Sequence, residues 1–370
     1  LATEIHSDIN VPSGRNSAMD GYAINAADIP ESGLKTLKLV GSSFAGTPFK
    51  QSLNPGECIR IMTGAILPEG SDTVVMQEHV DADGDQVNID SSIKPGANVR
   101  QAGEDLAVGD LVLEQGMRLT PADIGLLASL GIGEVEVFRK LKVAFFSTGD
   151  ELRSVGEPLE DGMIYDSNRY TLYGMLHRLG AEIIDMGVVR DDRELMDRAF
   201  TEAMDNADVL ITSGGVSVGE ADYVKETLLK IFEVNFWNVA MKPGRPLTFG
   251  KLGKTWFFGL PGNPVSVMVG FYQFVQPSLS RLAGEKARAP VLLKVPCTSK
   301  LKKRPGRVEY QRGILEADES GQMVVRKTGA QGSGILRSMA DANCFIILPL
   351  ESDGIQPGDM VDVQLFHGIV

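Results

Sequence analysis

The sequence predicts a multidomain protein of the α/β plus β class, in which β-rich segments flank a mainly parallel α/β domain. Its 370 residues exceed what one hydrophobic core usually organises. Strand and helix patterns alternate from about residue 141, whereas short apolar stretches broken by Gly, Pro and Asp occur on either side. The predicted division is a connecting domain (residues 1–13 and 104–138), a β-rich insertion domain (14–103), an α/β domain (139–288) and a C-terminal β-barrel domain (289–370).

Composition excludes several classes of protein. Hydrophobic residues make up 43% of the chain and charged residues 23%, which is the balance of an ordinary globular protein. The net charge of −13 opposes binding to nucleic acid or to an anionic membrane. No run of ~18 uncharged apolar residues is present to form a transmembrane helix. We therefore expect small-molecule ligands, with no nucleic-acid or membrane partner.

The cysteines indicate a reducing compartment. Cys58, Cys297 and Cys344 are odd in number, far apart and not arranged as CxxC, which argues against a zinc ribbon or a disulfide framework. The first residues also lack the basic and apolar regions of a secretory signal. We therefore expect a cytoplasmic protein.

The first half of the chain contains one clear helix signal. Thr120 is a predicted N-cap, Pro121 is the first helical residue, and Gly131 is the C-terminal stop. Residues 14–103 instead show the short apolar stretches of strands. Because residues 1–13 and the helix segment flank this insertion, we expect them to pair.

Regular alternation begins in the second half. Strands are predicted at residues 143–147, 183–189 and 209–212. One helix is predicted where apolar residues are spaced i, i+3, i+4 and i+7 from Leu172, and a second helix at residues 193–206. This order implies a mainly parallel sheet covered by helices. A helix is expected after Pro264, to about residue 282, and later strands at residues 291–298, 309–316, 324–328, 344–350 and 360–366.

A glycine-rich segment, residues 212–222, follows the third strand and precedes a helix-like stretch, residues 223–232. Glycines allow close approach of a ligand, and a helix N-terminus offers free N–H groups to phosphate. Neither GxxxxGK[ST] nor GxGxxG is present, so a plain turn is the competing interpretation. Its position favours phosphate, because ligands of parallel sheets bind beyond the carboxyl ends of strands.

Acidic and polar residues follow the neighbouring strands. Residues 147–151 come directly after the first strand, so they are expected at the same edge of the sheet. Asp150, Glu151 and Asp222 are candidates to hold Mg²⁺, a cation served by carboxylates and ligand phosphates. Capping of helices is the alternative for each of them, as it is for Asp166 and Asn168 and for the loop at Asp191.

Cationic and rigid loops complete the candidate site. Lys242 and Arg245 stand in a proline-stiffened loop and suit an oxyanion, although solvated charges on a turn are the alternative. Residues 261–264 break a strand and start a helix, with a substrate-lining role as an addition. Residues 300–312 carry six basic side chains against one acidic one, either to solubilise the surface or to attract an anion. Ser333 lies in a further loop and offers a hydroxyl donor.

Nine segments together resemble the MoeA family, which includes the catalytic domain of gephyrin. They occur in the order seen in that family and cover nearly the whole chain: NSAMDGYA, IRIMTGA, AGED, STGDEL, SGGVSVGEADY, KPGRP, LPGNPVS, QRG and QGS. Two features depart from the family pattern. Family members usually carry a further helical segment before the first residues of this chain, and many have Lys where this chain has Arg245.

The resemblance implies insertion of molybdenum from molybdate into adenylylated molybdopterin, with Mg²⁺-assisted cleavage of the phosphoanhydride and release of AMP. It also implies a homodimer of L-shaped, four-domain protomers, in which the insertion domain of the neighbouring subunit joins the cleft. A molybdopterin adenylyltransferase and cofactor-accepting enzymes are the implied partners. The alternatives are an adenylyltransferase acting on molybdopterin, a scaffold that binds a partner, and a general nucleotide-binding protein.

The resemblance also assigns site residues. The implied catalytic residues are Asp20, Thr63 and Asp105 from the insertion side, with Glu151 and Asp222, which are also the implied Mg²⁺ ligands. Molybdate would be held by Lys242, Arg245, Arg312 and Ser333. The rest of the substrate would be bound by Ser147, Gly149, Asp150, Asn168, Asp191, Ser213, Gly214, Gly215, Ser217, Pro261, Gly262, Asn263 and Pro264.

Overall fold

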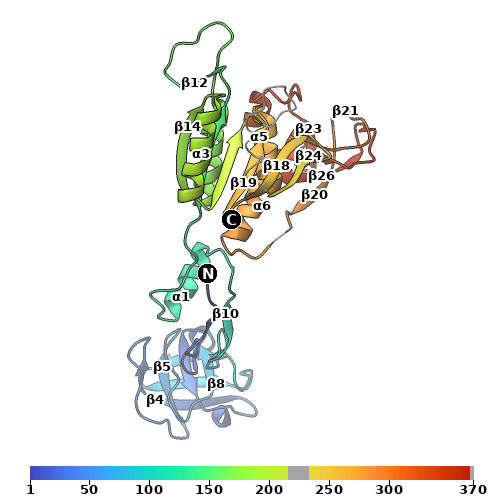
Figure 1. The fold of residues 1–370 in the computed structure, drawn as a ribbon. Coiled ribbons are helices and arrows are strands. Elements are labelled where there is room, and N and C mark those ends of the chain that lie inside the picture. Colours follow the sequence, from blue (N-terminus) through green and yellow to red (C-terminus); the bar gives the residue numbers. More distant parts are fainter. Residues whose placement is uncertain (216–232, 288, 367–370) are drawn as a thin grey trace. The chain divides into compact units, whose positions relative to one another are not determined.

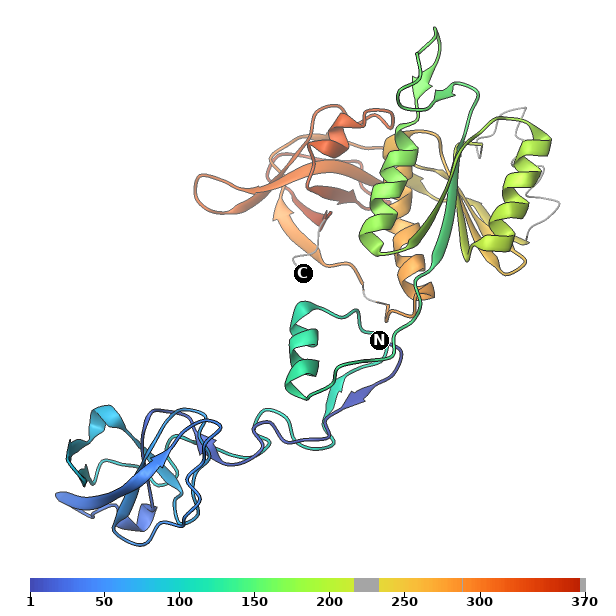
Figure 2. The same ribbon diagram turned by 90° about the vertical axis from the view of Figure 1, so that its left-hand side faces the viewer.

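The computed structural model describes residues 1–215, 233–287 and 289–366. It separates into two compact units, Leu1–Val137 and Phe138–Val370, and each is described by itself. Figures 1 and 2 follow the chain from blue to red through both units. Within the described residues, no helix combines the length and apolar character needed to cross a membrane.

The first unit contains a six-stranded mixed sheet. Its core lies on both faces, with one cluster around Ile24 and Val87 and another around Ile59 and Val74. Alternate residues of each strand therefore serve opposite clusters, as the period of a β-strand requires. The strand order is β6 (Thr73–Met76), β3 (Gly21–Ile24), β5 (Glu57–Ile61), β4 (Leu34–Ser43), β8 (Gln86–Asp90) and β7 (Asp81–Asp83).

Segments before and after this sheet pair with each other. Strand β1 (Ile5–His6) pairs antiparallel with β10 (Leu111–Leu113), and β2 (Asn16–Ser17) pairs with β9 (Val99–Arg100). Leu1, Leu113 and Leu127 are buried together beside these strands. The first residues and the segment after the insertion thus share a small core, as their flanking positions in the sequence predict.

Helix α1 (Pro121–Ser129) confirms the helix signal. The Thr120 side chain accepts a hydrogen bond from the Asp123 N–H, and the Asp123 carboxylate accepts one from the Thr120 N–H, which forms a capping box. Gly131 has a φ of +74°, the left-handed conformation that ends helices. The local sequence was therefore sufficient to specify this helix.

The second unit begins with a six-stranded α/β sheet. The first four strands in spatial order are parallel, and the last two are antiparallel. The sequence predicted the parallel part, but the antiparallel edge was not anticipated. The spatial order is β14 (Glu182–Val189), β11 (Lys142–Thr148), β15 (Val209–Ser213), β19 (Thr255–Leu260), β18 (Pro246–Leu252) and β16 (Glu233–Asn238).

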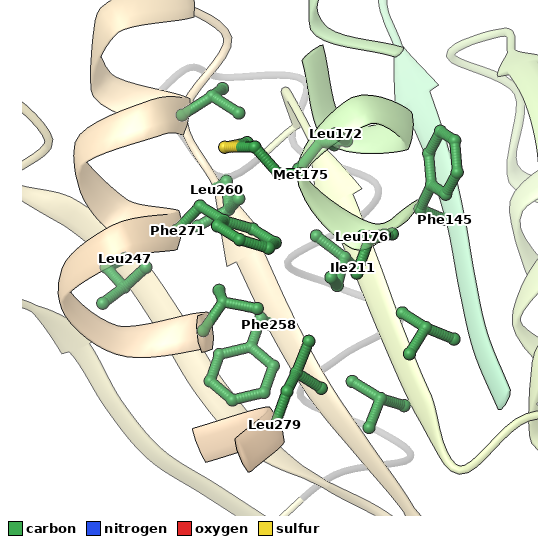
Figure 3. Packing of buried hydrophobic residues seen from close by; sticks show 14 residues of the cluster. Phe145, Leu172, Met175, Leu176, Ile211, Leu247, Phe258, Leu260, Phe271 and Leu279 are labelled. Carbon is green, nitrogen blue, oxygen red and sulfur yellow. The ribbon is translucent and has the colours of Figure 1, made fainter. Parts of the chain in front are cut away.

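Helices cover both faces of this sheet. Helix α2 (Ser167–Leu179) and the long helix after Pro264 pack on one face against Val143 and Phe145. Helix α3 (Arg193–Asn206) packs on the other face against Ala144 and Phe146, and Figure 2 shows α2 and α3 on opposite sides. Figure 3 shows the first of these cores, where Met175 and Leu176 of α2 lie near Phe271, and Phe258 lies toward Leu279.

The long helix is continuous but irregular. It runs as α5 (Pro264–Gly270), a π-helical turn η3 (Phe271–Val275) and α6 (Gln276–Leu282). Pro277 has no N–H, so the usual i→i−4 bond to the carbonyl of Gln273 cannot form. Widening to i→i+5 bonds just before this proline accommodates the missing donor. The predicted helix is thus confirmed, and Pro277 accounts for its π-helical turn.

The C-terminal sheet continues the second unit. All five predicted strands are present, and β17 (Met241–Lys242) joins them from the α/β segment by pairing with β22. One isolated bridge joins Cys297, which directly follows the strand at residues 292–296, to Val325 on the strand at residues 323–327. The order is β17, β22 (Val308–Ala317), β24 (Cys344–Leu348), β26 (Met360–Leu365) and β20 (Leu292–Pro296), with β23 (Met323–Lys327) also on β22.

Short elements complete the second unit. The loop after β11 contains β12 (Leu152–Arg153) and β13 (Ile164–Tyr165), and the C-terminal region adds β21 (Leu301–Lys302), α7 (Arg337–Ala340) and β25 (Gly354–Ile355). The helix-like stretch expected at residues 223–232 lies outside the described residues. The same is true of Ser217 and Asp222 from the glycine-rich segment.

Candidate functional site

The carboxyl ends of the parallel strands bring several predicted site residues to one edge. Ser147 on β11 is in register with Ser213 on β15, and Ser213 is in register with Leu260 on β19. The loops that follow these residues therefore leave the sheet at the same level. They carry Gly149 to Glu151, Gly214 and Gly215, and residues 261–264. The sequence-based expectation of a shared edge is confirmed for these loops.

Asn168 links three of the segments at this edge. Its amide nitrogen donates one hydrogen bond to Ser213 Oγ at 2.8 Å and another to the carbonyl of Gly262 at 2.7 Å. The side chain is buried at the first turn of α2. Because a carbonyl is only an acceptor, the Gly262 bond also fixes which end of the amide is nitrogen. Asn168 thus positions the loops after β15 and β19.

Gly214 is held where only glycine fits. Its φ is +92°, and its N–H donates to the carbonyl of Leu260 at 3.0 Å. A Cβ at this position would lie 2.5 Å from the carbonyl oxygen of Thr148. The glycine is therefore required by the close approach of two strand ends, independently of any ligand.

An acidic cluster lies beside these loops. The Asp191 N–H is 3.4 Å from Asp150 Oδ1, which brings the loop after β14 to the loop after β11. Burial raises the pKa of Asp191, and the charges of Asp150 and Glu151 raise it further. Among the described residues, no three His, Cys, Asp or Glu side chains are arranged to hold a metal ion. The cluster is thus a region of concentrated negative charge.

A cavity of about 770 Å³ lies between the α/β sheet loops and the C-terminal sheet, within the second unit. We name it the basic cavity, because six cationic side chains and one acidic side chain line it. The cationic residues are Lys242, Lys300, Lys302, Arg307, Arg312 and Lys327, and the acidic residue is Glu309. The remaining wall includes Gly215, Pro261, Gly262, Asn263 and Ser333.

Arg312 is the most buried cation of this cavity. Its side chain is 1% exposed, and it donates from Nε to Ser338 Oγ and from Nη2 to the carbonyl of Gly332, both at 3.0 Å. Burial lowers its pKa to about 10, which still leaves it charged at pH 7. In the described part of the chain no carboxylate forms an ion pair with it. A buried, uncompensated cation facing a cavity favours an anionic ligand.

Lys242 and Ser333 also line the basic cavity, whereas Arg245 does not. Arg245 is exposed, and its carbonyl accepts a hydrogen bond from the Val239 N–H. The structure therefore brings three of the four predicted molybdate-binding residues together. The role of Arg245 stays a prediction that the cavity lining does not support.

The basic segment at residues 300–312 divides into ligand-facing and structural residues. Lys303 is buried, and its ammonium donates to the carbonyls of Leu350 at 3.1 Å and Ser352 at 2.9 Å. It therefore ties two loops together and does not face the cavity. Lys327 lines the cavity from β23 but was missed by the sequence analysis, because no local pattern marks a single lysine on a strand.

A second cavity, of about 540 Å³, adjoins the first and is here called the acceptor cavity. Both cavities include Gly262 and Asn263 in their walls. Among the described residues that line the acceptor cavity, none has a cationic side chain. Its wall consists of Thr148, Glu151, Leu152, Ile164, Tyr165, Asp166, Ser167, Asn168, Ser213, Gly262, Asn263, Pro264, Gly334 and Leu336.

In the first unit, Asp20 and Thr63 form a pair. Asp20 Oδ1 accepts hydrogen bonds from the N–H and the hydroxyl of Thr63, both at 2.7 Å. The backbone bond lowers the pKa of Asp20 most, followed by the hydroxyl bond. Asp105 takes no part in this pair; it is exposed, and its N–H donates to the carbonyl of Val11. The structure thus joins two of the three residues predicted on the insertion side.

The cysteines provide no soft metal site. Cys58, Cys297 and Cys344 are buried and free. Burial raises the pKa of Cys58 and Cys344 to about 12 and also raises that of Cys297. They therefore remain thiols, whereas a thiolate is the form that binds metals.

A parallel α/β sheet with its carboxyl-edge loops beside a basic cavity, and a β sheet as the opposite wall, defines a multidomain α/β protein that binds anionic ligands. Three family models match along the chain: the MoeA N-terminal region (domain I and II) at residues 1–131, the probable molybdopterin binding domain at residues 144–281, and the MoeA C-terminal region (domain IV) at residues 294–366. The chain belongs to the MoeA family.

Similar proteins span nearly the whole chain. It is 48% identical to a molybdopterin molybdenumtransferase of Haemophilus influenzae, over 100% of this chain and 91% of that protein. It is 35% identical to gephyrin of Dictyostelium discoideum, over 100% of this chain and 58% of that protein. A crystal structure of a molybdopterin biosynthesis MoeA protein from Pyrococcus horikoshii OT3 is similar with a TM-score of 0.85 and 30% identity, over 99% of this chain and 91% of that one.

Proposed function

We propose that the protein is a molybdopterin molybdenumtransferase, an enzyme of molybdenum cofactor biosynthesis. The observation that carries this proposal is the pair of adjoining cavities at the carboxyl edge of the parallel strands, one basic and the other with no cation among its described lining residues. A substrate with an anionic and a neutral part fits this division of charge. The names of the full-length relatives support the same activity.

The proposed reaction takes molybdate and adenylylated molybdopterin as substrates and releases AMP. Molybdate is a dianionic oxyanion, so Arg312, Lys242 and Ser333 bind it by charge-assisted and hydroxyl hydrogen bonds. The buried thiols are unsuited to molybdenum, so the sulfur ligands come from the dithiolene of the pterin. The basic side chains also neutralise charge that develops as the phosphoanhydride is cleaved.

We further propose that Mg²⁺ is the cofactor. Oxygen donors are the ligands that Mg²⁺ prefers, and a cation relieves the crowding of negative charge that raises the pKa of Asp191. Glu151, beside Asp150 and Asp191, fits that chemistry, and Asp222 is the second proposed ligand. When bound, the ion would neutralise phosphate oxygens. Ser213, Gly214, Gly215 and Ser217 hold the phosphate in this proposal.

The proposal extends to assembly and location. The protein is a cytoplasmic homodimer of four-domain protomers in which the C-terminal sheet closes into a barrel. Asp20, Thr63 and Asp105 face the cleft from the insertion domain of the neighbouring subunit. A molybdopterin adenylyltransferase supplies the substrate, and cofactor-accepting enzymes take the product.

One experiment separates this activity from its alternatives. Purified protein is incubated with adenylylated molybdopterin, Mg²⁺ and molybdate, and both AMP release and active cofactor are measured. The proposal requires both products, and both must depend on molybdate. An adenylyltransferase would instead consume ATP in the presence of molybdopterin, and a scaffold or a general nucleotide-binding protein would give neither product.

A further inference from the structure

Three oxygens in the acceptor cavity are buried and lack a hydrogen-bond partner. They are Thr148 Oγ1, Asp166 Oδ2 and Asn168 Oδ1, within the described part of the chain. The three side chains are 5%, 2% and 7% exposed, and all three line the cavity. A buried polar atom without a partner is costly, so such a group points to a ligand or a water molecule.

Helix capping explains only part of Asp166. Its Oδ1 accepts the N–H of Arg169 at 3.1 Å and so caps α2. One oxygen is enough for an N-cap. The second oxygen is left without a partner in a cavity wall, although the same cap at α3 is made by Asp192, an exposed residue. The burial of the second oxygen is therefore not required by the helix.

The free atoms form an almost purely accepting surface. Both N–H groups of the Asn168 amide are used, by Ser213 Oγ and by the carbonyl of Gly262. Only its oxygen remains, and the free carboxylate oxygen of Asp166 belongs to a residue that lines the same cavity; neither of these two oxygens can donate. The Thr148 hydroxyl is the one group of the three that can also donate. The complementary ligand surface is a row of donors.

This requirement discriminates between the two ring systems of the proposed substrate. Each hydrogen-bonding edge of adenine combines one amino donor with ring nitrogens that are acceptors, and those acceptors would meet the accepting surface unpaired. The 2-amino-4-oxopyrimidine edge of a pterin presents an exocyclic amine and a ring N–H side by side. Both groups are donors, so this edge complements the wall, whereas adenine leaves buried atoms unsatisfied.

We propose that the acceptor cavity binds the amino-pyrimidinone edge of a pterin, with Asp166 Oδ2 and Asn168 Oδ1 accepting from its ring N–H and exocyclic amine. The inference rests on the proposed function and adds Asp166 as a specificity-determining residue. Leu152, Ile164 and Leu336 add apolar surface to the same cavity, which suits a flat ring. Because Gly262 and Asn263 line both cavities, the basic cavity adjoins this site and can take the anionic part of the same substrate.

The test uses the substitution Asp166→Asn in the full chain. Asparagine caps helices as well as aspartate does, so its oxygen retains the Arg169 bond while its amide nitrogen replaces the free oxygen. An acceptor thereby becomes a donor, without a change of size. Asp192→Asn is the matched control, because Asp192 caps α3 and does not line the cavity.

The measurements are inhibition constants for pterin, its 2-deamino analogue 4-oxopteridine and AMP, together with the KM values for both substrates. Wild-type protein should prefer pterin over 4-oxopteridine by about tenfold or more, and Asp166→Asn should reduce this preference to about threefold or less. Its KM for adenylylated molybdopterin should rise by about tenfold, with KM for molybdate and inhibition by AMP within about twofold of wild type. Thermal unfolding checks that both variants fold.

Two results would overturn the inference. One is an unchanged preference between the two pteridines, or no inhibition of wild-type protein by pterin up to its solubility limit. The other is a loss of affinity for AMP in Asp166→Asn with no loss for pterin, because the cavity would then bind the nucleotide. Absence of molybdate-dependent AMP release from wild-type protein would count against the proposed function itself, which keeps the two failures apart.

Discussion

The ammonium of Lys242 lies 3.0 Å from Glu309 Oε1, although the Lys242 side chain is 57% exposed and that of Glu309 is 6% exposed. The other oxygen of Glu309 accepts from Gln311 Nε2 at 3.0 Å. The buried carboxylate thus pairs with an exposed cation at the wall of the basic cavity. An anion that takes up Lys242 must compete with this carboxylate for the same ammonium.

We therefore expect Glu309→Gln to bind simple oxyanions more tightly. Removing the carboxylate frees Lys242 and makes the cavity more positive. Molybdate and sulfate should both bind about threefold to tenfold more tightly, with a steeper dependence on salt. Calorimetric titration at two ionic strengths measures this. Weaker molybdate binding in the variant would show that the carboxylate positions Lys242 for the anion.

Arg312→Met should weaken oxyanion binding without destabilising the fold. The guanidinium is buried and has no carboxylate partner among the described residues, so replacing it by an apolar side chain removes a desolvated charge. We expect molybdate affinity to fall at least about tenfold and the unfolding midpoint to stay equal or rise. Arg304→Met is the control, since Arg304 belongs to the same basic segment but is exposed and outside the cavity.

Gly214→Ala should destabilise the second unit more than an equivalent change elsewhere. Alanine at a φ of +92° costs about 1–2 kcal/mol, and its Cβ would also meet the Thr148 carbonyl at 2.5 Å. Gly156 has a φ of +96° with no atom within 4 Å of a Cβ, so Gly156→Ala isolates the backbone cost. Chemical denaturation should give a larger loss for Gly214→Ala. Equal losses would mean that the strand ends can move apart.

Gly214 illustrates how much of the fold and of the site the sequence could predict. The Thr120 cap, the first three strands of the α/β sheet and the helices between them depend on neighbours in the chain, and these were predicted correctly. The glycine-rich segment was recognised, but the reason for Gly214 is a contact with Thr148, about 66 residues away in sequence. Lys327 and Glu309 were missed as cavity residues for the same reason, since only the pairing of β17 with β22 and of β22 with β23 brings them there.

Asp191→Asn should raise stability at neutral pH and weaken Mg²⁺ binding. The folded state raises the pKa of Asp191, so the folded protein holds this proton more readily than the unfolded chain. Stability is then lost as pH rises from 3.8 through the raised pKa, and the penalty is complete once pH exceeds that pKa. The variant should melt higher than wild type at pH 7 and equally at a pH below 3.8.

Magnesium provides the second arm of this experiment. If the ion binds the acidic cluster, Mg²⁺ should raise the melting temperature of wild-type protein and should raise that of Asp191→Asn by less. Asp192→Asn again serves as the control, because its side chain caps α3. An equal response of all three proteins to Mg²⁺ would remove Asp191 from the proposed metal site.

Asp20→Asn should lower turnover without altering the fold of the first unit. Thr63 can still donate to the amide oxygen, so the local hydrogen bonds persist while the negative charge is lost. If Asp20 positions or deprotonates water, molybdate-dependent AMP release should fall by about 10²-fold. Since Thr63 lowers the pKa of Asp20, its carboxylate stays charged above pH 5, and its titration should add no limb to the rate profile between pH 5 and 8.

Asp8→Asn, which changes an exposed residue of the same unit, is the control for Asp20→Asn. Near-normal turnover with intact folding and substrate binding would reject an essential role for the Asp20 charge.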